Sequence, residues 1–229
     1  MKIKNNLKNI ISLLKLPLFF AAIMVLIKLI ESIGGFNLYL FGIHPRRIEN
    51  LMGILFSPLI HGSWSHLWNN VSSFIPLSVM LLFFYPKRGT FVFFVSYIIT
   101  GALIWIGARP SFHIGASGWI YAIAFYLFFN ALFDRSLKSI PVLLVVVLFY
   151  GSMVWGVLPV PDYMGISWEG HLFGAITGFF LAYKLPAHFK KNPLKYTWQK
   201  EKKILDDLEH KPFTYEEVNP KENKNDFDF

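Results

Sequence analysis

The chain has 229 residues, of which 54% are hydrophobic and only 16% are charged, and its mean hydropathy is +0.45. This composition excludes an ordinary soluble domain, which must present a charged surface to water, and indicates a polytopic membrane protein. The formal net charge of +8 does not indicate a nucleic-acid partner, because most Lys and Arg residues lie in the termini and in two short loops. With no cysteine, the chain has no disulfide, thiolate nucleophile or cysteine-ligated metal site.

Six apolar stretches are close to the length of about 20 residues that a helix needs to cross a bilayer. Backbone polar groups in lipid must be hydrogen-bonded within their own segment, so each stretch is predicted to be a helix. We therefore predict an all-α polytopic membrane protein with six transmembrane helices, at residues 10–33, 64–84, 90–107, 114–133, 140–158 and 168–185.

The first stretch is the weakest, because Lys15 and Lys28 lie near its ends. Lysines before an apolar run also occur in secretory signals, but no small-x-small cleavage site follows cleanly here. The segment continues through Glu31 instead, so we predict an uncleaved first span behind a short N-terminus at residues 1–9.

A large outer loop is predicted between the first two spans, at residues 34–63. Its composition is neither fully apolar nor fully polar, because aromatic residues such as Phe36 and Phe56 flank the polar run at 44–47. Such a mixture suits an element that is partly embedded in the membrane interface better than a solvated loop.

The positions of the basic residues predict that both termini are cytoplasmic. Lysines crowd the N-terminus and follow the sixth span, and the loops at 85–89 and 134–139 each carry two basic residues. Basic residues concentrate on the cytoplasmic side, and the opposite loops hold only Arg46, Arg47 and Arg109. Tryptophans mark the predicted outer ends of the spans, where aromatic belts form: Trp64, Trp68, Trp105, Trp119, Trp155 and Trp168.

A polar tail follows the sixth span and mixes Lys with Asp and Glu. Its apolar residues form one weak helical stripe, and the end of the tail is predicted to be disordered. The stripe comprises Leu194, Trp198, Leu205 and Leu208. We therefore expect three parts: the N-terminus at 1–9, a membrane domain at 10–186 and a cytoplasmic tail at 187–229.

Ser117 and His171 are polar residues just inside two spans that enter the membrane from the outside, and Asn70 lies at a similar depth in a third. Serine becomes a good nucleophile only when a base takes its proton, and histidine is the usual base. No Asp or Glu lies in the outer halves of spans two to five. Glu169 is two residues from His171 and therefore faces another side of the helix. The pattern favours a Ser-His dyad over a triad with a carboxylate.

Hydrolysis of a peptide bond also needs hydrogen-bond donors for the oxyanion that develops on the scissile carbonyl. His66 and Asn70 are four residues apart and share one helix face. The backbone N–H of Ser117, near a helix start, is a further candidate donor. Tyr121, one turn after Ser117, is expected to pack on the imidazole of His171.

Glycines flank both catalytic candidates. Gly115 and Gly118 allow the backbone to approach other groups closely around the serine. A second set forms a small-xxx-small ridge that is expected to bring the sixth span against the fourth: Gly170, Gly174 and Gly178.

Each feature alone has a plainer explanation. Small residues and serine are common where membrane helices touch, and a lone histidine near the interface is usually an anchor or a hydrogen-bonded core residue. His113 is interpreted in this way, as an interfacial residue rather than a base. The conjunction of Ser117, His171 and Asn70 at one depth in three helices is what favours catalysis.

These motifs resemble the rhomboid family of intramembrane serine proteases. The resemblance rests on the run Gly115-x-Ser117-Gly118, on Tyr121 four residues after the serine, and on histidine followed by two spaced glycines. It also rests on a second-span arrangement of His61, then His66-x-x-x-Asn70, and it covers about residues 10–186. One departure concerns the first loop, where many members carry a Trp-Arg pair and this chain has only the run at 44–47.

The resemblance implies the basic six-span bacterial form, located in the inner membrane. Ser117 is then the nucleophile and His171 the general base, while Asn70, His66 and the Ser117 amide line the oxyanion hole. The implied partners are the lipid bilayer and transmembrane protein substrates, which are cleaved near the outer membrane boundary without a cofactor or metal. The fifth helix and the loop with Pro159 and Pro161 are the expected lateral gate or cap.

Two other functions remain open from the sequence. One is a proteolytically inactive rhomboid-like protein that binds membrane helices as an adaptor or chaperone, although such a role needs neither Ser117 nor His171. The other is a transporter or metal carrier, and the shortage of intramembrane carboxylates argues against it. The carrier would use four histidines: His61, His66, His113 and His171.

Overall fold

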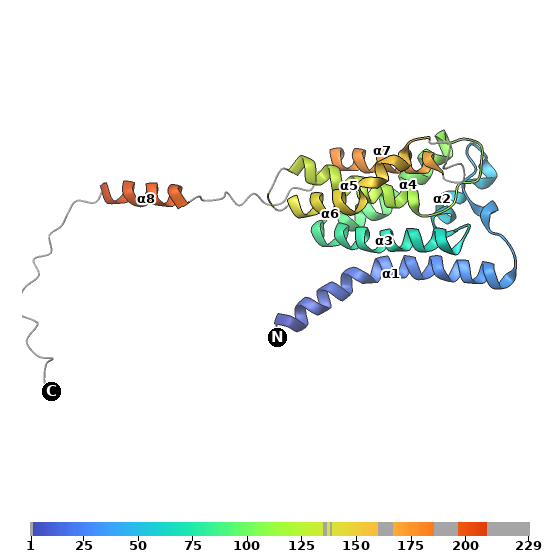
Figure 1. Ribbon diagram of the computed structural model, residues 1–229, viewed down its shortest axis with the longest axis horizontal. Coiled ribbons are helices and arrows are strands. Elements are labelled where there is room, and N and C mark those ends of the chain that lie inside the picture. The colour runs from blue at the N-terminus through green and yellow to red at the C-terminus, as the bar shows by residue number, and fades with distance from the viewer. Residues whose placement is uncertain (1, 135–136, 138, 160–166, 186–196, 210–229) are drawn as a thin grey trace, which may run out of the picture. The chain divides into compact units, whose positions relative to one another are not determined.

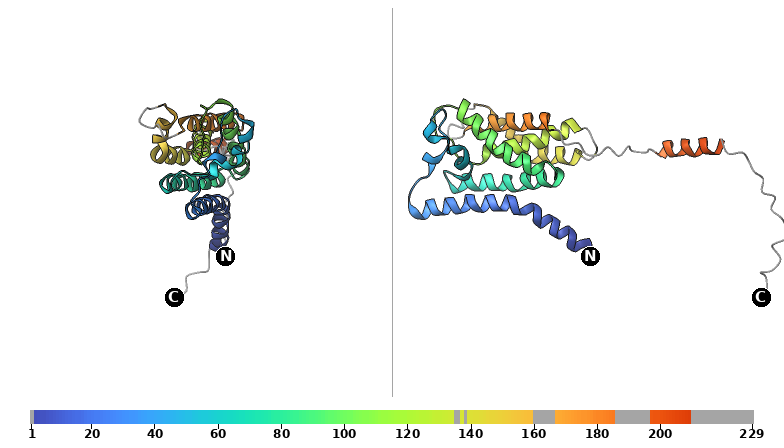
Figure 2. Two further views of the ribbon diagram at one scale, coloured as in Figure 1. Left: turned by 90° about the vertical axis from the view of Figure 1, so that its right-hand side faces the viewer. Right: turned by 180° about the vertical axis from the view of Figure 1, so that it is seen from behind.

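The computed structural model describes residues 2–134, 137, 139–159, 167–185 and 197–209. The chain divides into two compact units, Met1–Phe189 and Lys190–Phe229. Long helices of the first unit run side by side, in parallel or antiparallel directions (Figures 1 and 2). They are α1 (Lys2–Gly34), α3 (Trp64–Phe84), α4 (Gly89–Gly107), α5 (Ser117–Asp134), α6 (Ile140–Tyr150) and α7 (Trp168–Lys184).

Four of the described helical segments are long and apolar enough to cross a membrane. The fourth joins α6 to the 3-10 helix η4 (Gly151–Val157), and the four comprise Ile11–Gly34, Trp64–Phe84, Gly89–Gly107 and Ile140–Val157. Neither α5 nor α7 is among them, since α7 has only 17 residues and α5 carries Asn130 and Asp134 near its end. The all-helical membrane fold is therefore confirmed, while the count of six spans stays a prediction.

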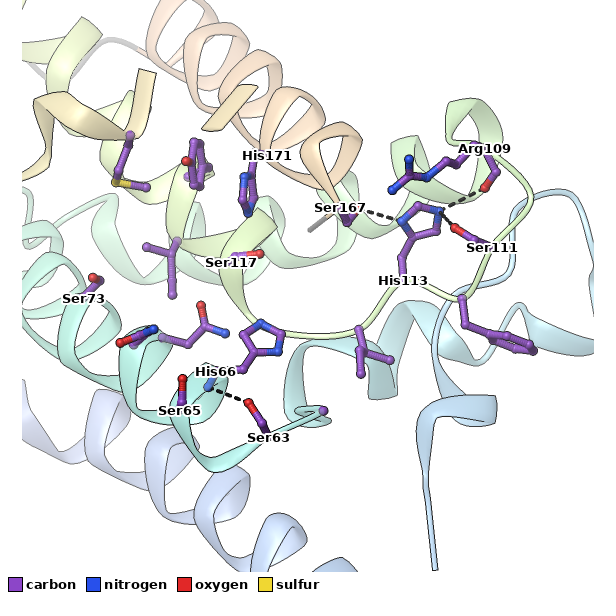
Figure 3. Close-up of a pocket in the computed structure, with 18 residues that line it drawn as sticks. Ser63, Ser65, His66, Ser73, Arg109, Ser111, His113, Ser117, Ser167 and His171 are labelled. Carbon is purple, nitrogen blue, oxygen red and sulfur yellow. Dashed lines mark hydrogen bonds between the residues drawn. The ribbon is translucent and has the colours of Figure 1, made fainter. Parts of the chain in front are cut away.

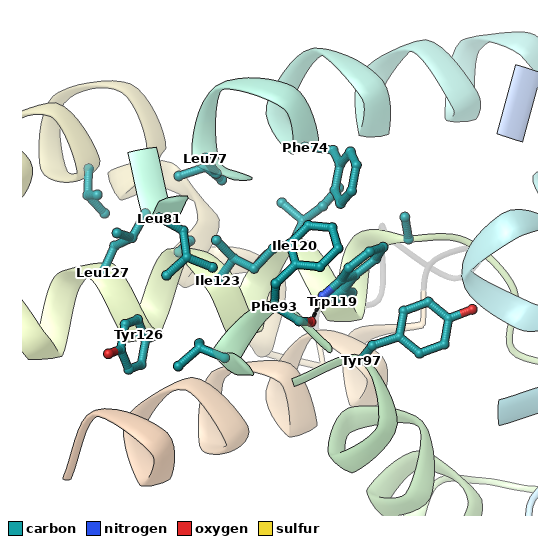
Figure 4. Close-up of a cluster of buried hydrophobic side chains, with 14 of the residues drawn as sticks. Phe74, Leu77, Leu81, Phe93, Tyr97, Trp119, Ile120, Ile123, Tyr126 and Leu127 are labelled. Atoms are coloured by element: carbon teal, nitrogen blue, oxygen red, sulfur yellow. Dashed lines mark hydrogen bonds between the residues drawn. The ribbon is translucent and has the colours of Figure 1, made fainter. Parts of the chain in front are cut away.

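Helix α5 is the centre of the first unit and packs against α3, α4, α6 and α7. Most of its side chains are buried, as expected for a helix inside a bundle. The half-buried or exposed residues share one face: Phe125, Phe128, Phe129 and Leu132. Trp119 fills the core between α3 and α4: its ring contacts Phe74 and Phe93, and its Nε1–H donates to the Phe93 carbonyl at 2.9 Å (Figure 4). The helix that begins with Ser117 is thus held by the surrounding bundle.

The contact between α5 and α7 is the most extensive in the bundle and depends on glycine. A Cβ atom on Gly174 would collide with the backbone carbonyl of Gly118, and one on Gly178 would collide with that of Ala122. A Cβ atom on Gly118 would lie 3.0 Å from the Gly170 carbonyl oxygen, which is tighter than ordinary van der Waals contact. The predicted glycine ridge is confirmed at Gly174 and Gly178, which let the two backbones approach closely, whereas a Cβ on Gly170 would face Ser167 and Ile104 instead of α5.

The first outer loop is built from short helices and is tied to the loop that follows α4. Arg46 donates from Nη1 to the Ala108 carbonyl at 2.9 Å, and Trp105 donates from Nε1 to the Arg47 carbonyl at 3.0 Å. These bonds anchor the loop although its Trp-Arg pair is missing. Several apolar side chains of the loop are exposed, including Phe41, Ile48 and Met52, and their insertion into the membrane interface stays a prediction. The short helices are η1 (Tyr39–Phe41), η2 (Ile48–Asn50), α2 (Gly53–Phe56) and η3 (Ser57–Leu59).

A buried ion pair in α1 joins three segments near this loop. Lys28 Nζ lies 2.7 Å from Glu31 Oε2 and also donates to the Gly62 carbonyl at 3.2 Å. The other carboxylate oxygen, Glu31 Oε1, accepts from the Leu38 backbone N–H at 2.8 Å. The pair therefore connects α1 to the start of the first loop and to the turn that precedes α3.

We expect Lys28→Met to lower the free energy of unfolding by about 3 kcal/mol, because it leaves the Glu31 charge buried without its partner. The double variant Lys28→Met/Glu31→Gln removes both charges and is expected to recover part of the loss. The measurement is the unfolding midpoint in a denaturing-detergent titration. Lys15→Met, at an exposed position of the same helix, is the control and should change stability by less than about 0.5 kcal/mol. Equal unfolding midpoints for Lys28→Met and Lys15→Met would show that the Lys28–Glu31 pair does not stabilise the fold.

The second unit contains the described helix α8 (Thr197–Glu209), a 13-residue amphipathic segment. It covers most of the stripe predicted for the tail, although Leu194 lies outside the described residues. The assignment of residues 187–229 as a separate cytoplasmic tail stays a prediction.

Candidate active site

A cavity of about 910 Å³ opens between the starts of α3, α5 and α7 (Figure 3). Five of the six residues predicted for the catalytic site line it, contributed by three helices far apart in the chain. The sixth, Gly115, has no side chain and contributes backbone beside the cavity. The five are His66, Asn70, Ser117, Tyr121 and His171.

Ser117 is the first residue of α5, and the segment before it is held in place by hydrogen bonds. Gly115 N–H donates to the Ser57 carbonyl at 2.9 Å, and its φ of +102° is one that glycine adopts far more readily than other residues. A Cβ at this position would also lie only 2.7 Å from the His66 ring. Glycine at 115 therefore meets both a conformational and a steric requirement next to the serine.

His171 lies in the first turn of α7, and its imidazole is held on two sides. Nδ1 is 2.9 Å from the Gly156 carbonyl of η4, and the ring stacks on Tyr121 with centroids 4.1 Å apart and planes at 4°. A carbonyl oxygen only accepts, so Nδ1 carries the proton that it donates. In the neutral ring Nε2 is then the proton acceptor, and no carboxylate is needed to select this tautomer.

Glu169 is directed away from His171, as its helix position predicted. Its Oε1 lies 3.1 Å from Arg109 Nε, so this carboxylate pairs with the loop after α4. The orienting group for His171 is consequently a backbone carbonyl, and a triad with Glu169 is not formed.

The α3 wall of the cavity presents His66 and Asn70. The helix is capped by Ser63, whose Oγ accepts from the His66 backbone N–H at 3.0 Å. Asn70 is only 5% exposed, and its Nδ2 has no hydrogen-bond partner among the described residues. Buried amide donors are nearly always paired, so Asn70 Nδ2 is available to hydrogen-bond a molecule that occupies the cavity.

His61 lies behind the wall rather than in it. It is 1% exposed, and its ring packs edge-to-face on His66 with centroids 5.1 Å apart. Burial, followed by the nearby His66 charge, lowers the pKa of His61 to about 4, so the ring is neutral at physiological pH. Its contribution to the site is therefore packing against His66.

Three of the four histidines of the metal-carrier hypothesis, His66, His113 and His171, line the cavity, and His61 packs on His66. In the part of the chain that the structure describes, no group of three or more His, Cys, Asp or Glu side chains is arranged to hold a metal ion. His113 and His171 each use ring nitrogens in hydrogen bonds with distant residues instead.

Sequence reasoning missed Gly156 and the partners of His113. Nothing in a local pattern marks a backbone carbonyl as the partner of a side chain, so Gly156 carried no signal. His113 is 3% exposed and hydrogen-bonded to Ser167, which agrees with a structural role rather than that of a base, while its position at the membrane interface stays a prediction. Its partner Ser167 did carry a signal, because a serine directly before a predicted helix is a typical N-cap. Its Oγ accepts from the Gly170 backbone N–H.

Comparison with known proteins identifies the family of the chain. Residues 49–188 match the family described as the Rhomboid domain. The chain belongs to the rhomboid family. Its relatives include uncharacterized proteins of Mycobacterium tuberculosis and Mycobacterium bovis, each 34% identical over 181 residues, or 76% of this chain and 75% of the relative. A further uncharacterized protein, from Mycobacterium leprae, is 33% identical over 182 residues, covering 76% of this chain and 72% of the relative.

Family membership confirms the resemblance found in the motifs. Together with the four long apolar segments, it identifies an integral membrane protein. The match begins in the first loop and ends just after α7, so every cavity-lining helix lies within the rhomboid domain.

Proposed function

We propose that this chain is an intramembrane serine endopeptidase that uses a Ser117–His171 dyad. The observation that carries the proposal is the state of the His171 imidazole. Its Nδ1–H is bound to the Gly156 carbonyl and its face is held by Tyr121, which leaves Nε2 as the proton acceptor in the cavity lined by Ser117.

In the proposed reaction, Nε2 of His171 takes the hydroxyl proton as Ser117 Oγ attacks the scissile carbonyl. The resulting oxyanion receives hydrogen bonds from the Asn70 amide, the His66 ring and the Ser117 backbone N–H. Protonated His171 then gives its proton to the leaving amine, and the acyl-enzyme remains. Water attacks the ester with His171 again acting as base, which releases the acid and restores the hydroxyl of Ser117.

The proposal includes six spans, with both termini in the cytoplasm of a bacterial cell and the cavity opening toward the outer face. The central position of α5 and the close contact of α7 with it support the count, because helices surrounded by protein need a less apolar surface. Substrates are then single transmembrane segments, cut near the outer membrane boundary. Pro159 ends the described part of the proposed cap, and Pro161 lies outside the described residues.

The alternative is an inactive rhomboid-like protein that binds membrane helices. Such a protein has no need for the Asn70 amide, whose Nδ2 lines the cavity and has no partner among the described residues. Catalysis gives that donor a partner, because an oxyanion forms where the amide lines the cavity.

The test is cleavage of a single-span substrate by the purified protein in liposomes. We expect cleavage by the unaltered chain, complete loss in Ser117→Ala, and no effect of a metal chelator. Ser72→Ala is the matched control, because Ser72 is exposed on α3 and its hydroxyl only bonds the Asn69 carbonyl. Substrate binding without cleavage would favour the adaptor, and cleavage that survives in Ser117→Ala would remove the proposed nucleophile.

A further inference from the structure

His113 is a buried side chain for which the proposed mechanism has no use. It lies four residues before Ser117, lines the cavity and is hydrogen-bonded through both ring nitrogens. Nε2 is 3.0 Å from the Arg109 carbonyl oxygen, and Nδ1 is 2.6 Å from Ser167 Oγ (Figure 3).

The partners of His113 determine where its proton lies. The Arg109 carbonyl only accepts, so Nε2 carries the hydrogen and Nδ1 has the lone pair. Ser167 must therefore donate its hydroxyl proton to Nδ1. Burial lowers the pKa of His113, which agrees with a neutral ring.

Ser167 completes a link to the helix that carries His171. Its Oγ accepts from the Gly170 backbone N–H at 3.1 Å as the N-cap of α7, and its carbonyl accepts from the His171 backbone N–H at 3.3 Å. One hydroxyl thus caps the helix of the proposed base and bonds the segment that leads to the proposed nucleophile.

The His113 end of this link is fixed as firmly as the Ser167 end. The His113 backbone exchanges two hydrogen bonds with Ile43, at 2.8 and 3.0 Å, and its carbonyl also accepts from Ser57 Oγ at 2.8 Å. The His113 ring is therefore attached to a segment braced by the first loop.

The glycine contact and the Tyr121–His171 stack already hold α5 against α7. The Ser167–His113 hydrogen bond adds a directional restraint at the start of α7, because hydrogen bonds weaken steeply when their geometry is distorted. The ion pair from Arg109 to Glu169 is a second restraint between the same two segments, with the Arg109 side chain 46% exposed and that of Glu169 7% exposed. A misplacement of about 1 Å at a reacting group costs on the order of 10²-fold in rate.

We propose that His113 and Ser167 are positioning residues whose hydrogen bond holds the start of α7 at a fixed place relative to the start of α5. The bond thereby sets the approach of His171 to Ser117. This role rests on the proposed protease function for its effect on rate, whereas the bond itself is independent of that function.

The test is a double-mutant cycle on kcat with His113→Ala, Ser167→Ala and the double variant. Each single change is expected to lower kcat about 10- to 100-fold with KM nearly unchanged. The double variant should be no slower than the slower single variant, because both changes break the same bond. His113→Asn keeps an acceptor near the position of Nδ1 and should restore much of the rate. Ser111→Ala is the control, since it removes only the longer 3.3 Å contact to Nε2 and should leave kcat within about twofold.

Amide hydrogen exchange of residues 168–171 tests the His113–Ser167 hydrogen bond by a measurement that does not depend on catalytic activity. We expect exchange in this turn to be about tenfold faster in both single variants and unchanged in Ser111→Ala. Additive effects on kcat, a change confined to KM, or unaltered exchange would each overturn the positioning role. A chain that cleaves nothing would instead overturn the proposed function, and the exchange measurement would still decide whether the bond orders α7.

Discussion

Replacing His171 with alanine is expected to lower kcat for a single-span substrate by about 10⁴-fold or more, to a rate near that of Ser117→Ala. Removing either member of a nucleophile–base pair costs about as much as removing both, because the two act as one unit. The same variant should prevent labelling of Ser117 by a fluorophosphonate, since the unassisted hydroxyl is a poor nucleophile. Both quantities are measured on protein in liposomes or detergent, with labelling followed by mass spectrometry.

The control for this loss is His44→Ala, which removes a different buried histidine outside the cavity. His44, in the first loop, packs its ring on Phe112 of the segment between α4 and α5. We expect its replacement to affect stability more than labelling. Labelling of His171→Ala at the unaltered rate would show that His171 does not activate Ser117, and the dyad would then be wrong.

Asn70→Ala is expected to lower kcat by about 10²- to 10³-fold, which is the typical cost of removing one oxyanion donor. The buried Nδ2 has no partner among the described residues in the resting protein, so its removal breaks no hydrogen bond there. We therefore expect the unfolding midpoint to stay the same or rise slightly while the rate falls. A structural residue would instead lose rate and stability together.

Asn69→Ala is the matched control, because Asn69 is the exposed neighbour on the same helix. Its turnover should stay within a few-fold of the unaltered chain. Equal losses at both positions, or unchanged turnover in Asn70→Ala, would exclude Asn70 from the oxyanion hole.

Much of the helical framework follows from the sequence, because the requirement for backbone hydrogen bonding in lipid is local. The prediction of a helix at 64–84 agrees with α3, and the one at 168–185 differs from α7 by a single residue. The predicted helix at 140–158 ends earlier, at Tyr150, and continues as the 3-10 helix η4. That change of winding places the Gly156 carbonyl beside His171, and hydropathy contains no information about it.

The sequence motifs predicted part of the site because some requirements of helix packing leave a regular pattern of residues. Glycines at 174 and 178 were recognisable because close helix contact requires small residues at regular spacing, and Tyr121 followed from helix geometry. Asn70 was recognisable by its depth. Its unpaired amide was not, because pairing depends on what every neighbouring segment offers.

By itself, the sequence determined the membrane-embedded helical fold, the family and the identities of the proposed nucleophile and base, since hydrophobic length, glycine spacing and residue chemistry are local properties. Only the tertiary structure decided how the base is oriented and what holds its helix. The Nδ1 proton of His171 is directed by a carbonyl 15 residues earlier, and His113 bonds a hydroxyl 54 residues away. A backbone carbonyl is present at every residue and a serine cap at many helices, so neither becomes a specific partner until folding brings one of them within hydrogen-bonding distance.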